Sequence, residues 1–106
     1  MTPPRVLDWG QGWAPINEDG STHEGQLAKE LGPRHLLHGL ARVVFGRCLS
    51  CDDVVAALAC MPGDPDLAVI HLTWRGEPES EPDWPYFERM TFAEFLSRFV
   101  KGGEHL

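Results

Sequence analysis

The residues with the greatest potential for chemistry in this sequence are two cysteines in a C-x-x-C spacing, Cys48 and Cys51. Redox-active dithiols use this spacing, and a helix N-terminus then lowers the pKa of the first thiol. The usual redox domain has a βαβ unit before the motif, whereas a loop and one short helix precede it here. The competing interpretation is that the cysteines are reduced and pack as small hydrophobic side chains.

The same two thiols could share a zinc ion with two histidines upstream, His35 and His38. Zinc takes four nitrogen or sulfur ligands, but this His-x-x-His spacing is shorter than the common one. In an extended segment, side chains three positions apart also point to opposite faces. A thiol- or zinc-dependent protein that uses Cys48 and Cys51 is therefore the second hypothesis, and we expect no bound metal or cofactor.

The most informative single residue is His71, which lies in the segment with the clearest strand composition, Leu67–Trp74. Strand alternation divides this segment into two sets on opposite faces: Ile70, Leu72 and Trp74 on one, and Val69, His71 and Thr73 on the other. The first set is more apolar, so we expect it to face the helices and His71 to face an open side. There, His71 could be a base, a ligand or a partner contact. The alternative is a hydrogen-bonded structural histidine.

Other constellations give weaker signals. Asp52 and Asp53 could begin a metal site, but aspartates at a turn more often bond their own backbone. The sequence has no serine in a G-x-S-x-G elbow and no glycine-rich phosphate loop. We therefore assign no catalytic residue.

Hydrophobic periodicity and breaker residues indicate the elements that must position these side chains. We expect helices over about 23–31 and from Thr91 onward, a strand over 41–47, and a hairpin of Val54–Cys60 and Leu67–Trp74. The segment Val54–Cys60 could also be helical, since Ala and Leu favour a helix and its paired valines a strand. These elements predict an α+β fold, a small antiparallel meander sheet of three to four strands with two helices packed on one face.

Length and charge limit the class of protein. The 106 residues fit a single domain over 1–106, with residues 1–5 frayed. The net charge of −7, from nine basic and sixteen acidic residues, argues against nucleic acid and anionic membranes. It favours either a basic protein partner or simple solubility. Without an apolar leader or a membrane-length run, we expect a cytoplasmic protein with reduced cysteines.

The centre of the chain resembles a group of short bacterial proteins to which no activity is attached. The resemblance depends on an Asp-Asp-Val step at Asp52, a His-Leu-Thr-Trp strand at His71 and a Trp-Pro step at Trp84. A His-x-Leu-x-Gly step at His35 belongs to it as well, so it covers about residues 27–99. It implies a hairpin after the Asp-Asp-Val step and transfers no catalytic residue. The cysteines do not belong to the pattern.

The leading hypothesis is a non-catalytic protein-binding module of unknown specificity. Its site would be the open sheet face at His71 and Thr73, with Trp74 and Trp84 at the rim because tryptophan often anchors interfaces. One concrete form is an immunity-type inhibitor, a small acidic protein that binds a basic toxin. A homodimer through the same face or a sheet edge is a further possibility.

Overall fold

The computed structural model describes residues 3–16, 21–32, 35, 37–59, 66–73, 85–104 and 106. Of residues 1–5, which were predicted to be frayed, Met1 and Thr2 lie outside this set. The elements in chain order are β1 (Trp13–Pro15), α1 (Ser21–Glu30), β2 (Arg42–Cys48), β3 (Asp53–Leu58), β4 (Leu67–His71), β5 (Phe87–Met90), α2 (Phe92–Phe95) and η1 (Leu96–Lys101). The last of these is a π-helical segment that continues α2.

The strands form one open antiparallel sheet in the order β1-β2-β3-β4-β5, so the predicted meander is confirmed. The sheet has five strands rather than three to four. The additional strands are the two edges, and each is short: β1 has three residues and β5 has four. Runs of this length carry too few side chains to show the period-two pattern by which strands are recognised.

The predicted hairpin is also confirmed, because β3 and β4 pair antiparallel with Asp53 opposite His71 and Ala57 opposite Leu67. Cys60 and most of the connection between the two strands lie outside the described residues. The choice between helix and strand at Val54 is settled in favour of a strand. All six residues of β3 are buried, as expected for a strand that is covered on both faces.

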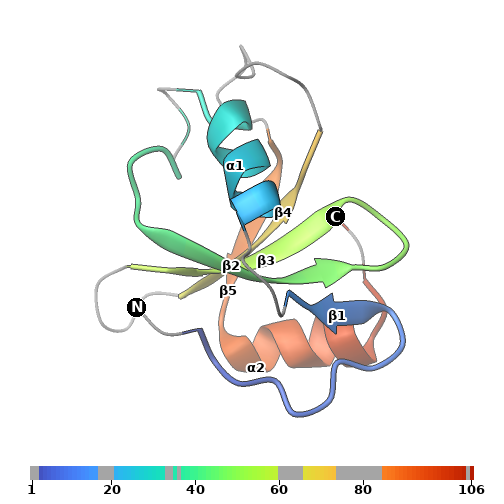
Figure 1. The fold of residues 1–106 in the computed structure, drawn as a ribbon. Helices are drawn as coiled ribbons and strands as arrows, with labels where there is room; N and C mark the ends of the chain where they lie inside the picture. The colour runs from blue at the N-terminus through green and yellow to red at the C-terminus, as the bar shows by residue number, and fades with distance from the viewer. Residues whose placement is uncertain are drawn as a thin grey trace.

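The two helices lie on opposite faces of the sheet, with α1 above it and α2 below it in Figure 1. The prediction that both pack on one face is therefore wrong. One buried cluster contains Trp13, Phe45, Cys48, Val55, Ala57, Leu67, Val69, Met90, Phe95 and Phe99. The other contains Leu27, Leu31, Leu37, Val44, Val54, Ala56, Leu58, Ala68, Ile70 and Leu72. Successive residues of β3 and β4 alternate between the clusters, and each apolar face needs a helix to cover it.

The helix that begins after Thr91 is confirmed. The Thr91 hydroxyl accepts from the backbone N–H of Glu94, whose carboxylate accepts in turn from the Thr91 backbone N–H. This reciprocal capping box fixes the start of α2. Further along, both terminal guanidinium nitrogens of Arg98 in η1 donate to the Glu88 carboxylate in β5, at 2.7 and 3.1 Å. The α2–η1 segment is thereby attached to the edge strand beside it.

The tryptophans near the N-terminus cover the core. Trp13 is 3% exposed, and its ring meets that of Phe95 edge-on with centroids 5.2 Å apart. Trp9 packs against Gly46, where a Cβ atom would lie 2.4 Å from the indole. Glycine is therefore required in β2 at the position where its register with β3 shifts. Among the described residues, no helix is long and apolar enough to cross a membrane.

Candidate functional site

Several of the residues singled out in the sequence meet at one end of the sheet. The C-x-x-C motif ends β2 and begins the turn into β3, whose first residue is Asp53. Antiparallel pairing then places Asp53 opposite His71, the last residue of β4. The cysteine pair, the Asp-Asp step and His71 were three separate signals in the sequence, and the fold brings them together.

The core of this site is a hydrogen-bonded pair between Asp53 and His71. Asp53 is 1% exposed, and its Oδ1 lies 2.8 Å from Nδ1 of His71. Its Oδ2 accepts from the backbone N–H of Leu106 at 3.0 Å. Since an ionised carboxylate can accept but not donate, Nδ1 of His71 carries the proton in this pair. The other ring nitrogen, Nε2, belongs to a side chain that is 35% exposed.

Tyr86, the residue before β5, is a backbone neighbour of His71. The His71 backbone N–H donates to the Tyr86 carbonyl at 2.8 Å, and Tyr86 is 50% exposed. Tyrosine is enriched at protein interfaces, and this exposed one is hydrogen-bonded through its backbone to the residue that carries the imidazole. Sequence reasoning missed Tyr86. The sequence signal for Tyr86 was its place two residues after Trp84 and directly before the strand that begins at Phe87.

Thr73 does not lie with His71. Its backbone N–H and its hydroxyl both donate to Oε1 of Glu30 in α1, at 2.7 and 2.9 Å. The prediction that His71 and Thr73 share one open face is therefore wrong. β4 ends at His71, and both faces of the sheet carry a helix. Trp74 and Trp84, the predicted rim, lie outside the described residues.

Cys51 is a slow nucleophile near neutral pH. Burial raises the pKa of its thiol to about 12, and a hydrogen bond with Cys48 and the negative charge of Asp53 act in the same direction. The Asp53 backbone N–H donates to the sulfur and opposes this rise in pKa. A thiol with this pKa is ionised in only about one molecule in 10⁵ at pH 7, and the thiolate is the reactive form.

The predicted zinc ligands are not assembled in the described part of the chain. Both ring nitrogens of His35 are engaged, because Nδ1 accepts from the Leu37 backbone N–H and Nε2 lies 2.9 Å from the Pro85 carbonyl. Among the described residues, no group of three or more His, Cys, Asp or Glu side chains is placed to hold one metal ion. His35 is instead a buried histidine whose ring is hydrogen-bonded to two segments, at Leu37 and at Pro85.

Two cavities border the site region. One, of about 100 Å³, is lined by His23, Arg47, Cys48, Cys51, Asp52, Asp53, Val54 and Leu72. Burial and then the charge of Arg47 lower the pKa of His23, which favours a neutral imidazole there. Asp52, the other aspartate of the pair, is exposed on the turn.

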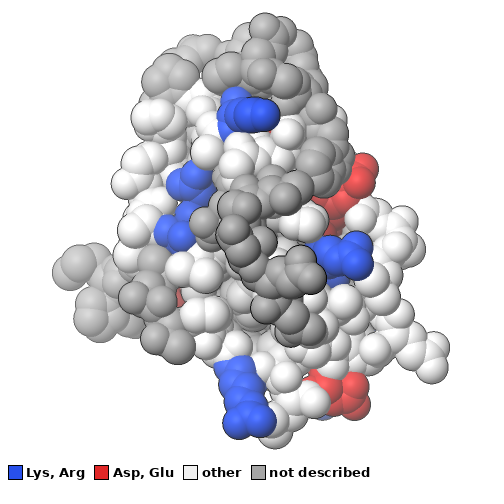
Figure 2. Space-filling view, viewed as in Figure 1, with Lys and Arg blue, Asp and Glu red and all other residues white. Residues whose placement is uncertain are grey.

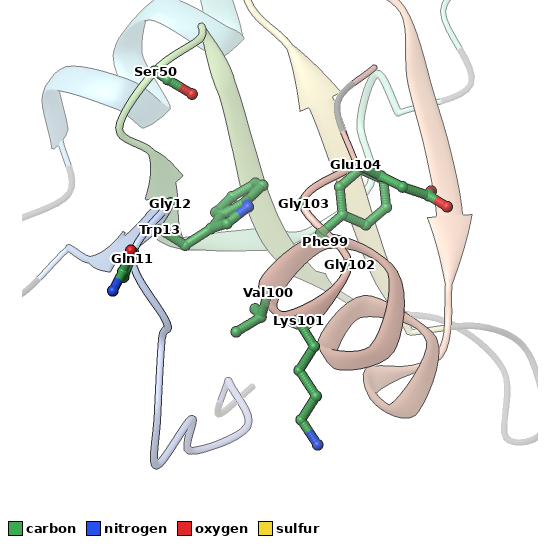
Figure 3. A pocket seen from close by; sticks show the side chains of 10 residues that line it. All are labelled: Gln11, Gly12, Trp13, Ser50, Phe99, Val100, Lys101, Gly102, Gly103 and Glu104. Carbon is green, nitrogen blue, oxygen red and sulfur yellow. The ribbon is translucent and has the colours of Figure 1, made fainter.

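The other cavity, of about 440 Å³, lies between the Gln11–Trp13 loop and the end of η1. In Figure 3, the Trp13 and Phe99 rings point inward and the Lys101 side chain points away. Both rings are almost wholly buried, at 3% and 1% exposed. The accessible walls are therefore mainly backbone and surface side chains. A ligand site needs polar groups that converge on one point, and this cavity lacks them among its described lining residues.

No family model, curated protein or solved structure matches this chain.

Proposed function

We propose that this chain is a non-catalytic protein-binding module whose contact surface centres on His71 and Tyr86. The observation that carries the proposal is the buried Asp53 carboxylate, which holds the ring of a histidine that still has a third of its side chain exposed. A side chain already fixed in one orientation loses less conformational freedom on binding. This arrangement is suited to recognition.

The described residues favour binding over catalysis. An imidazole oriented by a buried carboxylate also occurs in hydrolases, but there it activates a nucleophile within hydrogen-bond reach. The described contacts of His71 are those with Asp53 and Tyr86, and neither supplies a nucleophile. Cys51, the nearby thiol, stays protonated near neutral pH because its pKa is about 12.

The charge of the chain favours a basic protein as the partner. A net charge of −7 attracts a basic surface and raises the rate of encounter. Figure 2 shows acidic and basic side chains at separate places over one face, without a continuous patch of either sign among the described residues. The whole-chain charge therefore contributes more to steering than any single patch in this view. An immunity-type inhibitor of a basic toxin is one form of this function, and Trp74 and Trp84 remain proposed rim residues.

The proposal is tested by affinity purification from the native host with wild-type protein and matched variants. His71→Ala and Tyr86→Ala each remove one proposed contact, and Leu7→Ala removes another exposed large apolar side chain from a different segment. Partners retained by wild type and Leu7→Ala are then purified, and their affinities are measured. We expect both site variants to weaken binding at least about tenfold, which corresponds to roughly 1.4 kcal/mol.

Unchanged affinity in both site variants would reject the His71–Tyr86 surface. Affinity for a basic partner should also fall with added salt, because salt screens exposed charges. The alternative of a thiol- or zinc-dependent protein makes a different prediction. Protein purified without chelator would then contain stoichiometric zinc, and Cys51→Ser would lose it.

A further inference from the structure

The two cysteines of the C-x-x-C motif are neighbours in space as well as in sequence. Cys48 is the buried last residue of β2, and Cys51 is a partly exposed residue of the turn into β3. Both are free thiols, they line the same cavity of about 100 Å³, and the Cys51 thiol hydrogen-bonds with Cys48. The residues between them, Leu49 and Ser50, are exposed. The turn therefore presents two thiols in contact at the edge of the core.

We propose that Cys48 and Cys51 are a reversible modification site that forms an intramolecular disulfide by exchange with a low-molecular-weight disulfide. A disulfide requires the two Cβ atoms to lie about 3.5–4.5 Å apart, and thiols in hydrogen-bond contact need little movement to reach that geometry. The side chains between them are exposed, and the Leu49 backbone N–H donates to the Gly12 carbonyl at 2.8 Å, which leaves the cysteine side chains as the groups that must turn toward each other. This inference does not depend on the proposed protein binding.

The exchange has two steps and needs no other oxidant. A thiolate of the pair attacks one sulfur of the small disulfide, so a mixed disulfide forms and one small thiol leaves. The second cysteine, as its thiolate, attacks the protein sulfur of the mixed disulfide and releases the second small thiol. The protein loses two hydrogens, and the small disulfide is reduced to two thiols.

The environment of the pair sets the order and the rate of the steps. Cys51 is the more exposed thiol, so it forms the mixed disulfide, and the buried Cys48 resolves it. The pKa of Cys51 is about 12. At any pH below this pKa, raising the pH by one unit increases the fraction of Cys51 present as thiolate about tenfold. We expect the rate of exchange to increase about tenfold per pH unit between pH 7 and pH 9.

The test uses the full chain with Cys60→Ser, so that only the pair can react. The protein is equilibrated with reduced and oxidised glutathione at a series of ratios, quenched with acid, alkylated and weighed by mass spectrometry. The product should be two hydrogens lighter and carry no alkyl group or glutathione. The folded chain should become half-oxidised at a ratio of [GSH]² to [GSSG] at least about tenfold higher than the same chain in concentrated urea.

Single variants in the same background complete the test. Cys48→Ser and Cys51→Ser should give at most one glutathione adduct and no internal disulfide. Circular dichroism identifies a variant that fails to fold, and the comparison of folded with urea-unfolded parent protein decides the question in that case. A folded parent that accumulates only mixed disulfides, or that is no easier to oxidise than the unfolded chain, overturns the proposal.

Discussion

Glu30 and Asp53 are two carboxylates that are equally buried but have different kinds of hydrogen-bond partner. Glu30 is 0% exposed, and its oxygens accept from the Thr73 backbone, the Thr73 hydroxyl and the Gln26 amide. Asp53 is 1% exposed and accepts from one backbone N–H and from His71. The three Glu30 contacts named here come from neutral groups. Asp53 is hydrogen-bonded to an imidazole that reaches the surface.

This difference separates a structural site from a candidate functional one. A buried carboxylate is costly unless hydrogen bonds compensate for lost hydration, and both residues meet that requirement. Glu30 connects α1 to the chain after β4, so its contacts hold one helix on the sheet. Asp53 instead orients an imidazole whose other nitrogen is directed away from the pair. The contrast predicts that Glu30 matters for stability and that Asp53 and His71 matter for stability and binding.

The largest expected effect is the loss of stability in Glu30→Ala. The substitution removes the acceptor of three hydrogen bonds, from the Thr73 N–H, the Thr73 hydroxyl and the Gln26 amide, and each such bond contributes on the order of 1 kcal/mol. We expect the free energy of unfolding in urea to fall by about 3–4 kcal/mol in total. Glu30→Gln keeps one acceptor oxygen and should lose less than half as much. A loss below about 1 kcal/mol in Glu30→Ala would show that water replaces the carboxylate.

An intermediate effect is expected for His71→Ala. A substitution at an exposed site usually costs within about 0.5 kcal/mol. The structure revises this value, because the substitution removes one of the two hydrogen-bond donors of a buried carboxylate. We now expect about 1–3 kcal/mol in urea melts. Leu72→Ala, which empties a buried position in the cluster under α1, should cost about 2–5 kcal/mol and serves as the reference.

His71→Asn is the matched control for this prediction. An asparagine amide can place an N–H near the position of Nδ1, so it should restore most of the stability while changing the group presented to a partner. If His71→Asn is as unstable as His71→Ala, ring packing rather than the bond to Asp53 is the stabilising contribution. If His71→Ala matches Leu72→Ala, His71 belongs to the core, and the proposed surface loses its central residue.

Part of the fold could be predicted because its signals are local. The cap at Thr91 and the phenylalanines after it gave the C-terminal helix, and the length of the segments between breakers gave the β3–β4 hairpin. The prediction that both helices pack on one face of the sheet was wrong, and the sequence itself contains the reason. Val54-Val55-Ala56-Ala57-Leu58 is apolar at every position, and such a strand requires cover on both faces.

The site was less predictable, since it depends on register. The pairing of Asp53 with His71 follows from how many residues connect β3 and β4, and a shift of one residue would move His71 to the other face. Glu30 was overlooked although its signal was local. It lies three residues after Leu27 and next to Leu31, on the apolar stripe of α1. A carboxylate on such a stripe indicates a buried acceptor, and its donor, Thr73, can be found only in three dimensions.

The smallest expected effect comes from a third carboxylate, Glu94, which caps α2 at the surface. Hydrogen bonds from the Thr91 backbone N–H and hydroxyl, followed by the charge of Arg98, lower the pKa of Glu94 from its ordinary value of 4.5. A lowered pKa in the folded state means that ionised Glu94 stabilises the fold above pH 4.5. That contribution is lost as the pH falls through the lowered pKa. Glu94 should therefore make a contribution to stability that depends on pH.

Urea melts of wild type and Glu94→Gln at a series of pH values between about 6 and 3 measure this contribution. The difference in stability should be constant at the upper end and should shrink as the pH falls below the ordinary pKa, because the wild-type carboxylate becomes neutral like the amide. Glu94→Asp keeps the charge but shortens the reach to the Thr91 N–H, so it should retain only part of the pH dependence. A difference that stays constant down to the lowest pH would mean that the capping bond does not depend on charge.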